Sequence, residues 1–139
     1  MFVLAATALV VVVVTQWIAT PWQVRGDSME PTLRDGDRVI VDLWTLGGRS
    51  PNPREIVVVR GPDDEEIVKR VAREGAGGAN RYPDAWLPAE SPLESTFILL
   101  GDNPDASTDS RTFGRVPRHR IHGRVVWRYW PPSGWGKIE

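Results

Sequence analysis

Residues 55–73 read EIVVVRGPDDEEIVKRVAR, in which two runs of mainly β-branched residues, 55–60 and 66–73, flank the sequence Gly61-Pro62-Asp63-Asp64. Valine and isoleucine favour extended backbone, whereas glycine, proline and aspartate favour turns. The stretch therefore predicts two strands joined by a turn.

The same alternation of strand and turn signals continues in both directions along the chain. Further β-branched or aromatic runs cover 38–43, 96–100 and 121–130, and turn-forming residues occupy 36–37, 47–51 and 75–78. Many short strands with such spacing are typical of an antiparallel barrel or sandwich. We therefore expect an all-β, antiparallel barrel-like or sandwich-like domain over residues 21–139, in which the stretch 79–95, with three prolines, is an irregular connection.

The first 24 residues carry no charged side chain, and residues 10–14 are five consecutive valines. About 20 apolar residues at ~1.5 Å rise span a ~30 Å hydrocarbon core. Residues 1–20 just meet that length, Pro21 would end the helix, and Trp17 and Trp22 would lie at the membrane interface. We expect residues 1–20 to form one transmembrane helix.

A cleavable secretory signal is the alternative for this segment. Such a signal begins with basic residues and ends in small ones, whereas no basic residue precedes Val10 and Gln16-Trp17-Ile18 follow the apolar run. An anchor is therefore favoured. The nearest basic residues, beginning with Arg25, all follow the span, and by the positive-inside rule alone they would place the domain in the cytoplasm.

Composition limits the functions open to a chain of 139 residues, a length that suits one domain with a modest core. A net charge of −1 lacks the basic field that recruits nucleic acid, so no nucleic-acid partner is expected. Because the chain has no cysteine, it has no disulfide framework, no thiolate nucleophile and no cysteine-based zinc site.

Ser28 stands in the sequence Gly26-Asp27-Ser28-Met29-Glu30-Pro31-Thr32-Leu33. Pro31 disfavours a helix interior around it, so we expect a turn that exposes the serine. Such a serine can be a nucleophile, although Gly-Asp-Ser by itself is more typical of an ordinary turn.

Lys69 lies inside the valine-rich run 66–73, where strand alternation places Ile67, Lys69 and Val71 on one face. Burial on that apolar face would lower its pKa. A useful general base needs a shift of about 3 units from the ordinary ~10.4. Taken alone, the run favours a surface lysine on an edge strand, but serine and lysine are a known nucleophile–base pair.

Residues 101–114 (GDNPDASTDSRTFG) are dense in side chains that bond to nearby backbone, which predicts a rigid loop. Asp109 and Arg111 could form a charge-assisted pair within it. A calcium loop is disfavoured, because the aspartates lack the required spacing and no terminal glutamate follows. His119 and His122 would lie on opposite faces of a strand, so neither a histidine metal site nor a Ser-His-Asp set is favoured.

Together these segments resemble bacterial type I signal peptidases (leader peptidases) over nearly the whole chain and in the correct order. The resemblance rests on the apolar N-terminus, Ser28-Met29-x-Pro31-Thr32-Leu33, Val68-Lys69-Arg70-Val71, Gly101-Asp102-Asn103-x3-Ser107-x-Asp109-Ser110-Arg111-x2-Gly114 and Gly123-Arg124-Val125-Val126. Only about 30 residues separate Arg70 from Gly101, so the chain resembles a minimal form without the large inserted β-domain of long members.

The resemblance implies a membrane-bound serine endopeptidase that removes N-terminal signal peptides from exported pre-proteins at Ala-x-Ala-type sites. Ser28 would be the nucleophile, Lys69 its general base, and Ser107 the residue that orients the lysine. The expected supporting residues are Asp109 and Arg111 as an ion pair, Arg70, and Gly26, which marks a subgroup without a hydroxyl at that position of the oxyanion hole. The expected pocket for small substrate residues is lined by Met29, Leu33 and Val68.

The resemblance further implies no cofactor and no metal, with signal peptides and the lipid bilayer as partners. It places the catalytic domain of a single-pass protein on the outer face of the cytoplasmic membrane, against the charge count above. Two alternatives stay open. One is a related Ser-Lys peptidase that processes conjugation pilins or cleaves itself as a repressor; the repressor type would lack the span and the 101–114 loop. The other is a membrane-tethered β-domain that binds peptides without cutting them.

Overall fold

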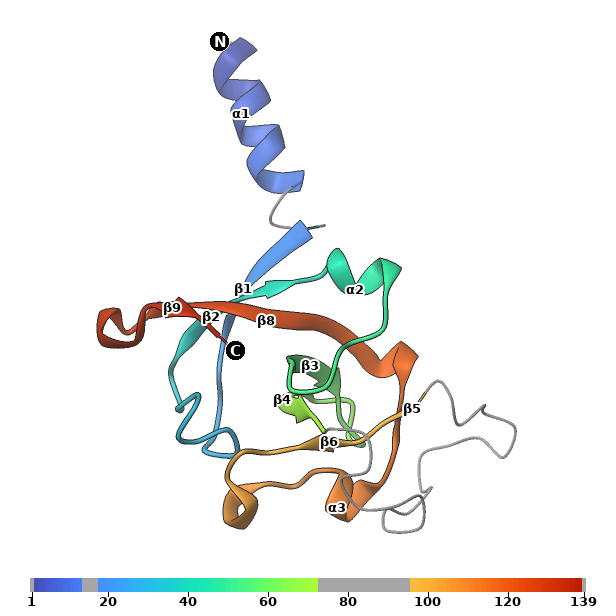
Figure 1. Cartoon of the computed structure of the whole chain (residues 1–139). Coiled ribbons are helices and arrows are strands. Elements are labelled where there is room, and N and C mark those ends of the chain that lie inside the picture. Colours follow the sequence, from blue (N-terminus) through green and yellow to red (C-terminus); the bar gives the residue numbers. More distant parts are fainter. Residues whose placement is uncertain (1, 14–17, 73–95, 139) are drawn as a thin grey trace.

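A computed structural model describes residues 2–13, 18–72 and 96–138 of the chain. Its main sheet has antiparallel strands in the order β1-β2-β8-β3-β4-β6, with β9 paired to β8 (Figure 1). These strands are β1 (Ala19–Gln23), β2 (Arg38–Asp42), β3 (Ile56–Arg60), β4 (Glu66–Val71), β6 (Leu99–Leu100), β8 (Ile121–Trp130) and β9 (Gly136–Lys137). The predicted all-β, antiparallel core is confirmed.

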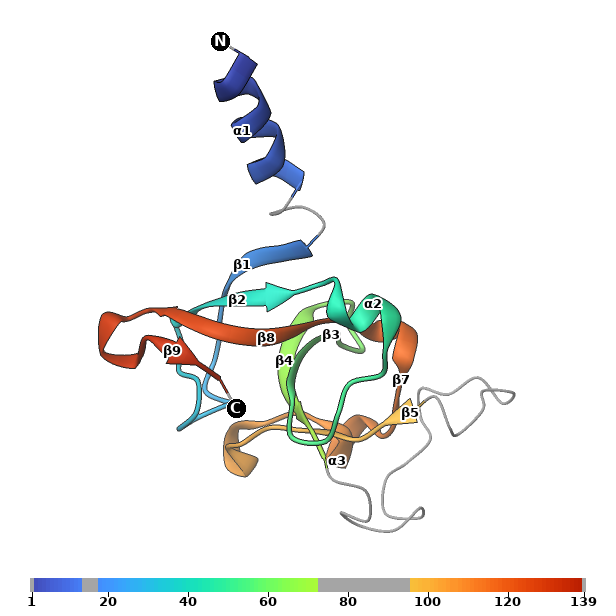
Figure 2. The ribbon, with the colours of Figure 1, turned by 45° about the horizontal axis from the view of Figure 1, so that its top comes forward.

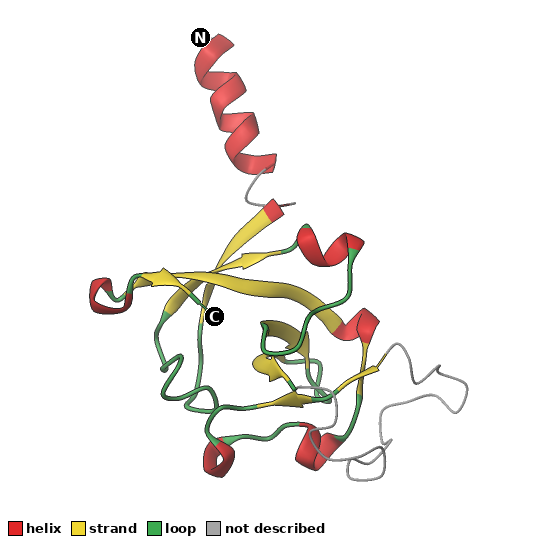
Figure 3. Ribbon diagram, in the orientation of Figure 1, coloured by secondary structure: helices red, strands yellow, loops and turns green. Residues whose placement is uncertain are grey.

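Helical turns lie at the ends of strands and in connections (Figure 3). They are α2 (Thr45–Gly48), α3 (Ser110–Phe113) and the 3-10 turns Pro104–Ala106, Arg118–Arg120 and Pro132–Gly134. The single strand predicted over 96–100 is wrong, because β5 (Thr96–Phe97) pairs with β7 (Val116–Pro117) whereas β6 pairs with β4. The predicted irregular connection 79–95 lies outside the described residues.

Helix α1 covers Phe2–Val13 and projects away from the sheet (Figures 1 and 2). Its 12 residues span about 18 Å at ~1.5 Å rise. None of the helices in the described residues is long and apolar enough to cross a membrane. The predicted helix through residue 20 is wrong at its end, because residues 19–23 form β1 and pair with β2. Pro21 therefore lies in a strand, opposite Ile40, at the end of the sheet order, where a residue without an N–H is tolerated.

Strand β3 is buried on both faces, which explains its unbroken apolar sequence. Val57 and Val59 pack into one apolar cluster, together with Leu46, Val71, Leu99, Phe113, Val116 and Ile121. Ile56 and Val58 pack into another, together with Val24, Met29, Leu33, Val39, Val41, Val68 and Val125. The second cluster thus holds the apolar residues that flank Ser28.

The β3–β4 hairpin brings Lys69 to an open edge of the sheet. Val57 is the register partner of Lys69 in β3. On the outer side of β4, Arg70 and Val71 pair with β6. Among the described strands, none pairs with this outer edge over residues 66–69.

Gly123 marks a close approach of β8 to β2. A Cβ at Gly123 would lie 2.6 Å from Val41 Cγ1 and 3.0 Å from Asp42 O. We expect Gly123→Ala to lower the free energy of unfolding by about 1–3 kcal/mol through overpacking, measured by urea unfolding with tryptophan fluorescence. The matched control is Gly47→Ala, because a Cβ there meets nothing within 4 Å. Equal stability of the two variants would contradict the close approach.

Candidate active site

Ser28 lies on a turn that is fixed on both sides. Gly26 has a φ of +75°, which glycine adopts without strain, and its N–H donates to Asp35 Oδ1 at 2.7 Å. Met29 and Leu33 are buried in the core, and Leu33 N–H donates to Met29 O at 2.9 Å. These anchors hold Ser28 in place while leaving its side chain partly exposed.

Lys69 reaches Ser28 from β4, with Nζ 2.7 Å from Ser28 Oγ. Lys69 is only 3% exposed. This burial lowers its pKa from the ordinary value of 10.5, while the charge of Asp109 raises the pKa and that of Arg111 lowers it. An amine in this position can accept the serine proton once it is neutral.

The loop 101–114 contacts the backbone of Ser28 at Gly101. Asn103 N–H donates to Ser28 O at 3.0 Å. A Cβ on Gly101 would lie 2.6 Å from Ser28 O and 2.1 Å from Ser107 Oγ. Only glycine permits so close an approach, and it brings Ser107 next to the backbone of Ser28.

The carboxylate of Asp109, 0% exposed, collects the hydrogen bonds of this loop. It accepts from Ser107 Oγ at 2.7 Å, from Gly101 N–H at 2.8 Å and from Arg111 Nε at 2.9 Å. Burial by itself would raise the pKa of Asp109, but these hydrogen bonds, that of Arg111 foremost, hold the pKa at about 2. Asp109 therefore stays ionised at neutral pH.

Arg70 lies on the opposite face of β4 from Lys69 and ties three segments together. Its Nε and Nη2 donate to Asp102 Oδ1 and Oδ2 at 2.8 and 2.7 Å. Thr32 Oγ1 donates to the same Oδ2 at 2.6 Å. Because Thr32 belongs to the Ser28 segment and Asp102 to the loop, this bidentate ion pair links the segment that carries Ser28, the strand β4 and the loop 101–114.

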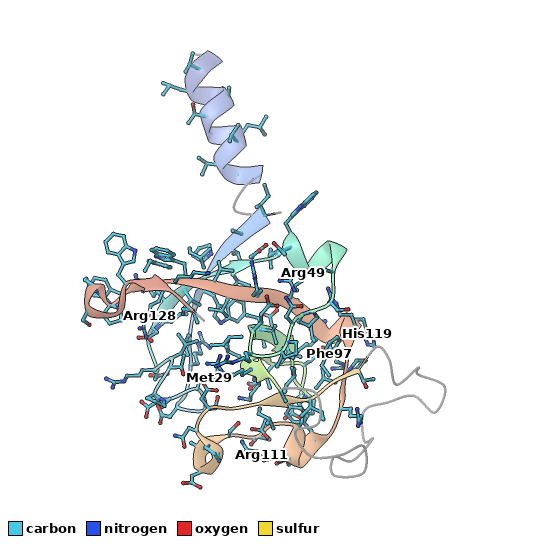
Figure 4. The ribbon with its side chains drawn as sticks, in the orientation of Figure 1. Met29, Arg49, Phe97, Arg111, His119 and Arg128 are labelled. Carbon is cyan, nitrogen blue, oxygen red and sulfur yellow. The ribbon has the colours of Figure 1, made fainter. Side chains whose placement is uncertain are left out.

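A cleft of about 530 Å³ opens beside Ser28 and Lys69. Its other lining residues come from β1, β4 and their flanks: Pro21, Trp22, Gln23, Arg25, Glu65, Glu66, Ile67 and Val68. Of the three predicted pocket residues, Val68 lines the cleft. Met29 and Leu33 do not, because they are directed into the core (Figure 4 shows Met29 inside the domain).

The histidines and the loop aspartates have other contacts. His122 Nδ1 lies 3.0 Å from Glu66 Oε1, and His119 is exposed. Asp102 and Asp109 are each paired with an arginine. Within the parts of the chain that the structure describes, no group of three or more His, Asp or Glu side chains could hold a metal ion.

Comparison with known proteins covers the segments that form this site. A family model described as "Signal peptidase, peptidase S26" matches residues 1–78 and 89–130, which include every site residue named above. The chain belongs to this family. The predicted class of enzyme, a serine peptidase of the signal peptidase I type, is confirmed with it.

Individual relatives match most of the peptidase. Signal peptidase IB of Staphylococcus aureus (strain N315) is 27% identical over 169 aligned residues, which cover 94% of this chain and 87% of the relative. Mitochondrial inner membrane protease subunit 1 of Xenopus tropicalis is 36% identical over 118 residues, which cover 82% of this chain and 71% of the relative.

Sequence reasoning missed several contacts of the peptidase's site. Asp102 lies 32 residues from Arg70, and Ser110, whose Oγ accepts the Leu99 N–H at 2.8 Å, is likewise paired with a residue outside its own turn. Both stand in the quoted loop motif, but local periodicity carries no signal for partners at such separations. The cleft walls Trp22 and Ile67 were missed for the same reason.

The lowered pKa of Asp109 makes the stability of the fold depend on pH. A carboxyl with a pKa of about 2, against 3.8 ordinarily, stabilises the fold by about 2 kcal/mol above pH ~4, and loses this as the pH falls towards ~2. We expect Asp109→Asn to lower the free energy of unfolding at neutral pH by at least that amount. It should also flatten the acid dependence, as measured by urea unfolding between pH ~7 and ~2.

The control for this measurement is Asp63→Asn on the exposed β3–β4 turn. It should leave both the stability and its acid dependence unchanged. If the stability of Asp109→Asn still falls in acid as it does in wild type, this pH dependence does not come from Asp109.

Proposed function

We propose that this chain is a membrane-anchored serine endopeptidase that removes N-terminal signal peptides from exported pre-proteins, with Ser28 and Lys69 as its catalytic dyad. Membership of the signal peptidase family supports the removal of signal peptides by a serine peptidase. The observation that carries the dyad is the 2.7 Å contact between Ser28 Oγ and the Nζ of a buried lysine.

In the proposed reaction, Ser28 Oγ attacks the carbonyl carbon of the scissile bond while neutral Lys69 takes the hydroxyl proton. The carbonyl oxygen becomes an oxyanion, for which the Ser28 N–H is one donor, worth about 10²–10³ in rate in typical oxyanion holes. Protonated Lys69 then gives its proton to the amine of the departing mature chain, which leaves the signal peptide esterified to Ser28. A water deprotonated by Lys69 hydrolyses this ester and restores the serine.

Lys69 must be neutral for this role, and its burial, rather than the nearby charges, favours that state. Its burial is the largest cause of the lowered pKa. Asp109 would work against it, but its carboxylate is already held by Arg111, Ser107 and Gly101 N–H. The guanidinium of Arg111 lowers the Lys69 pKa further. The Arg111 charge thus offsets part of the effect of Asp109, and the pKa of Lys69 remains below its ordinary value because of burial.

Two further residues receive proposed roles. Ser107 donates its proton to Asp109 and keeps lone pairs that can accept from the Lys69 amine, so we assign it to orienting that amine. Gly26 has no hydroxyl and its φ of +75° suits glycine. The second oxyanion donor is therefore not a side chain at that position.

The substrate is proposed to lie as an extended strand in the cleft, against the outer edge of β4. Among the described strands this edge has no partner over residues 66–69, so its backbone groups can pair with a peptide. Val68, Trp22 and Ile67 supply apolar walls next to the dyad. We assign the preference for small residues to these walls, and leave Met29 and Leu33 as core residues beneath Ser28.

The apolar N-terminus is proposed to anchor the enzyme as a single span, with the peptidase domain on the outer face of the cytoplasmic membrane. In α1, Val3 and Leu4 are 78% and 76% exposed, and such a helix is stable when lipid surrounds it. The Xenopus relative is by name an inner membrane protease, which supports membrane attachment. Because β1 begins at Ala19, the anchor is proposed to end before that residue and the peptidase domain to begin there.

The dyad is tested by cleavage of a pre-protein with an Ala-x-Ala site by the detergent-solubilised full chain. We expect wild type to release the mature product, and Ser28→Ala and Lys69→Ala to lose at least about 10³-fold in rate. Lys137 is the one other lysine of the chain and is exposed, so Lys137→Ala should retain activity. Normal cleavage by Lys69→Ala would contradict the assignment of Lys69 as the general base. A wild type that binds the pre-protein but never cleaves it would favour a peptide-binding domain.

The pH profile is a separate test of the same base. Because only neutral Lys69 is active and burial lowers its pKa, kcat/KM should rise with pH along one limb whose midpoint lies below 10.5. Lys137→Ala should keep this limb unchanged. An activity maximum in acid, or a midpoint at the ordinary lysine value, would be incompatible with Lys69 as the base.

A further inference from the structure

The cleft beside Ser28 is unequally charged along its length. Its titratable lining residues are Arg25, Glu65, Glu66 and Lys69. Lys69 contacts Ser28, whereas Glu66 opens β4 and Glu65 immediately precedes that strand. Two neighbouring glutamates at the start of β4 therefore line the same cleft that holds the dyad, with the Glu66 carboxylate against His122 of β8.

These carboxylates are only partly occupied by the protein's own cations. Within the described residues Glu65 has no ion-pair partner, and Glu66 is 3.0 Å from His122 Nδ1. Arg60, the register partner of Glu66 in β3, and Arg120 each form an ion pair with Asp64. Glu65 and Glu66 are both exposed, so a cationic side chain entering the cleft can reach them.

Their distance from the dyad follows from strand geometry. Glu66 precedes Lys69 by three residues, which at ~3.3 Å per residue is about 10 Å along β4. A substrate strand lying on this edge has the same rise. The residue opposite Glu66 or Glu65 is then three or four places from the residue whose carbonyl Ser28 attacks.

We propose that Glu65 and Glu66 form an acidic subsite that selects substrates with a lysine or arginine at this distance from the scissile bond. This inference rests on the proposed function and names a substrate class for it. The favoured residue is the fourth or fifth before the bond, or the third or fourth after it, according to the direction of the substrate strand. An acidic residue at the same place is disfavoured by repulsion.

The test uses a series of peptides that share one Ala-x-Ala site. In each peptide, one of the six positions on either side of the scissile bond, other than the two alanines, carries lysine, glutamine or glutamate. We expect kcat/KM to favour lysine over glutamate by about 3- to 10-fold at the named distance on one side only, and the preference to shrink in high salt. In the double variant Glu65→Gln, Glu66→Gln the lysine-to-glutamate ratio should fall to near one. Asp63→Asn, on the same turn but outside the cleft, should retain the ratio.

The same peptides are titrated against Ser28→Ala by fluorescence anisotropy, so that binding is measured without cleavage. If wild type cleaves nothing, the proposed function fails. The ratio of the Kd values of the lysine and glutamate peptides still tests whether Glu65 and Glu66 form an acidic subsite. The subsite is overturned if no position discriminates, if the ratio survives in the double variant, or if Asp63→Asn lowers it equally.

Discussion

A lysine in an apolar interior tends to lose its proton or to find an anion, and burial of Lys69 lowers its pKa and so shifts the balance towards the first. β4 carries this side chain into a nearly closed position, 3% exposed, against the hydroxyl of Ser28. The apolar clusters on both faces of β3 hold the hairpin that bears it. The reactivity that we propose for the site is therefore a consequence of core packing, since the same lysine on an exposed strand would remain charged.

The anion that could have kept Lys69 protonated is present but occupied. Asp109 is fully buried, and its oxygens accept hydrogen bonds from Arg111, Ser107 and the Gly101 backbone. The same bonds shape the loop that approaches Ser28 at Gly101, where a Cβ would collide with Ser107 and with the carbonyl of Ser28. One buried carboxylate thus supports the position of the nucleophile, while its charge, which raises the pKa of Lys69, is offset in part by that of Arg111.

The open edge of β4 is where we propose that this small domain holds a peptide. Residues 66–69 have no outer strand partner in the described parts of the sheet, while Arg70, one residue further, is bound to Asp102, which also accepts a hydrogen bond from Thr32. The outer edge of β4 is therefore unpaired up to Lys69 and paired from Arg70 onwards, next to the dyad. In the proposed complex, a peptide on the free part ends its pairing beside Ser28, which attacks its carbonyl carbon.

The sequence by itself determined the strands, the apolar N-terminus, the order of the motifs and, through alternation, the face on which Lys69 lies. Each of these depends on neighbours a few residues apart, where β-propensity and side-chain direction act.

Prediction from the sequence failed where a partner distant in the chain decides the outcome. Pro21 joined a strand because β2 was available to pair with it, and residues 96–100 divided between two partners. Met29 and Leu33 turned to the core, and Asp102 met Arg70 across 32 residues. Only tertiary structure could decide these, because burial and ion pairing depend on which segments meet, and no local pattern records that.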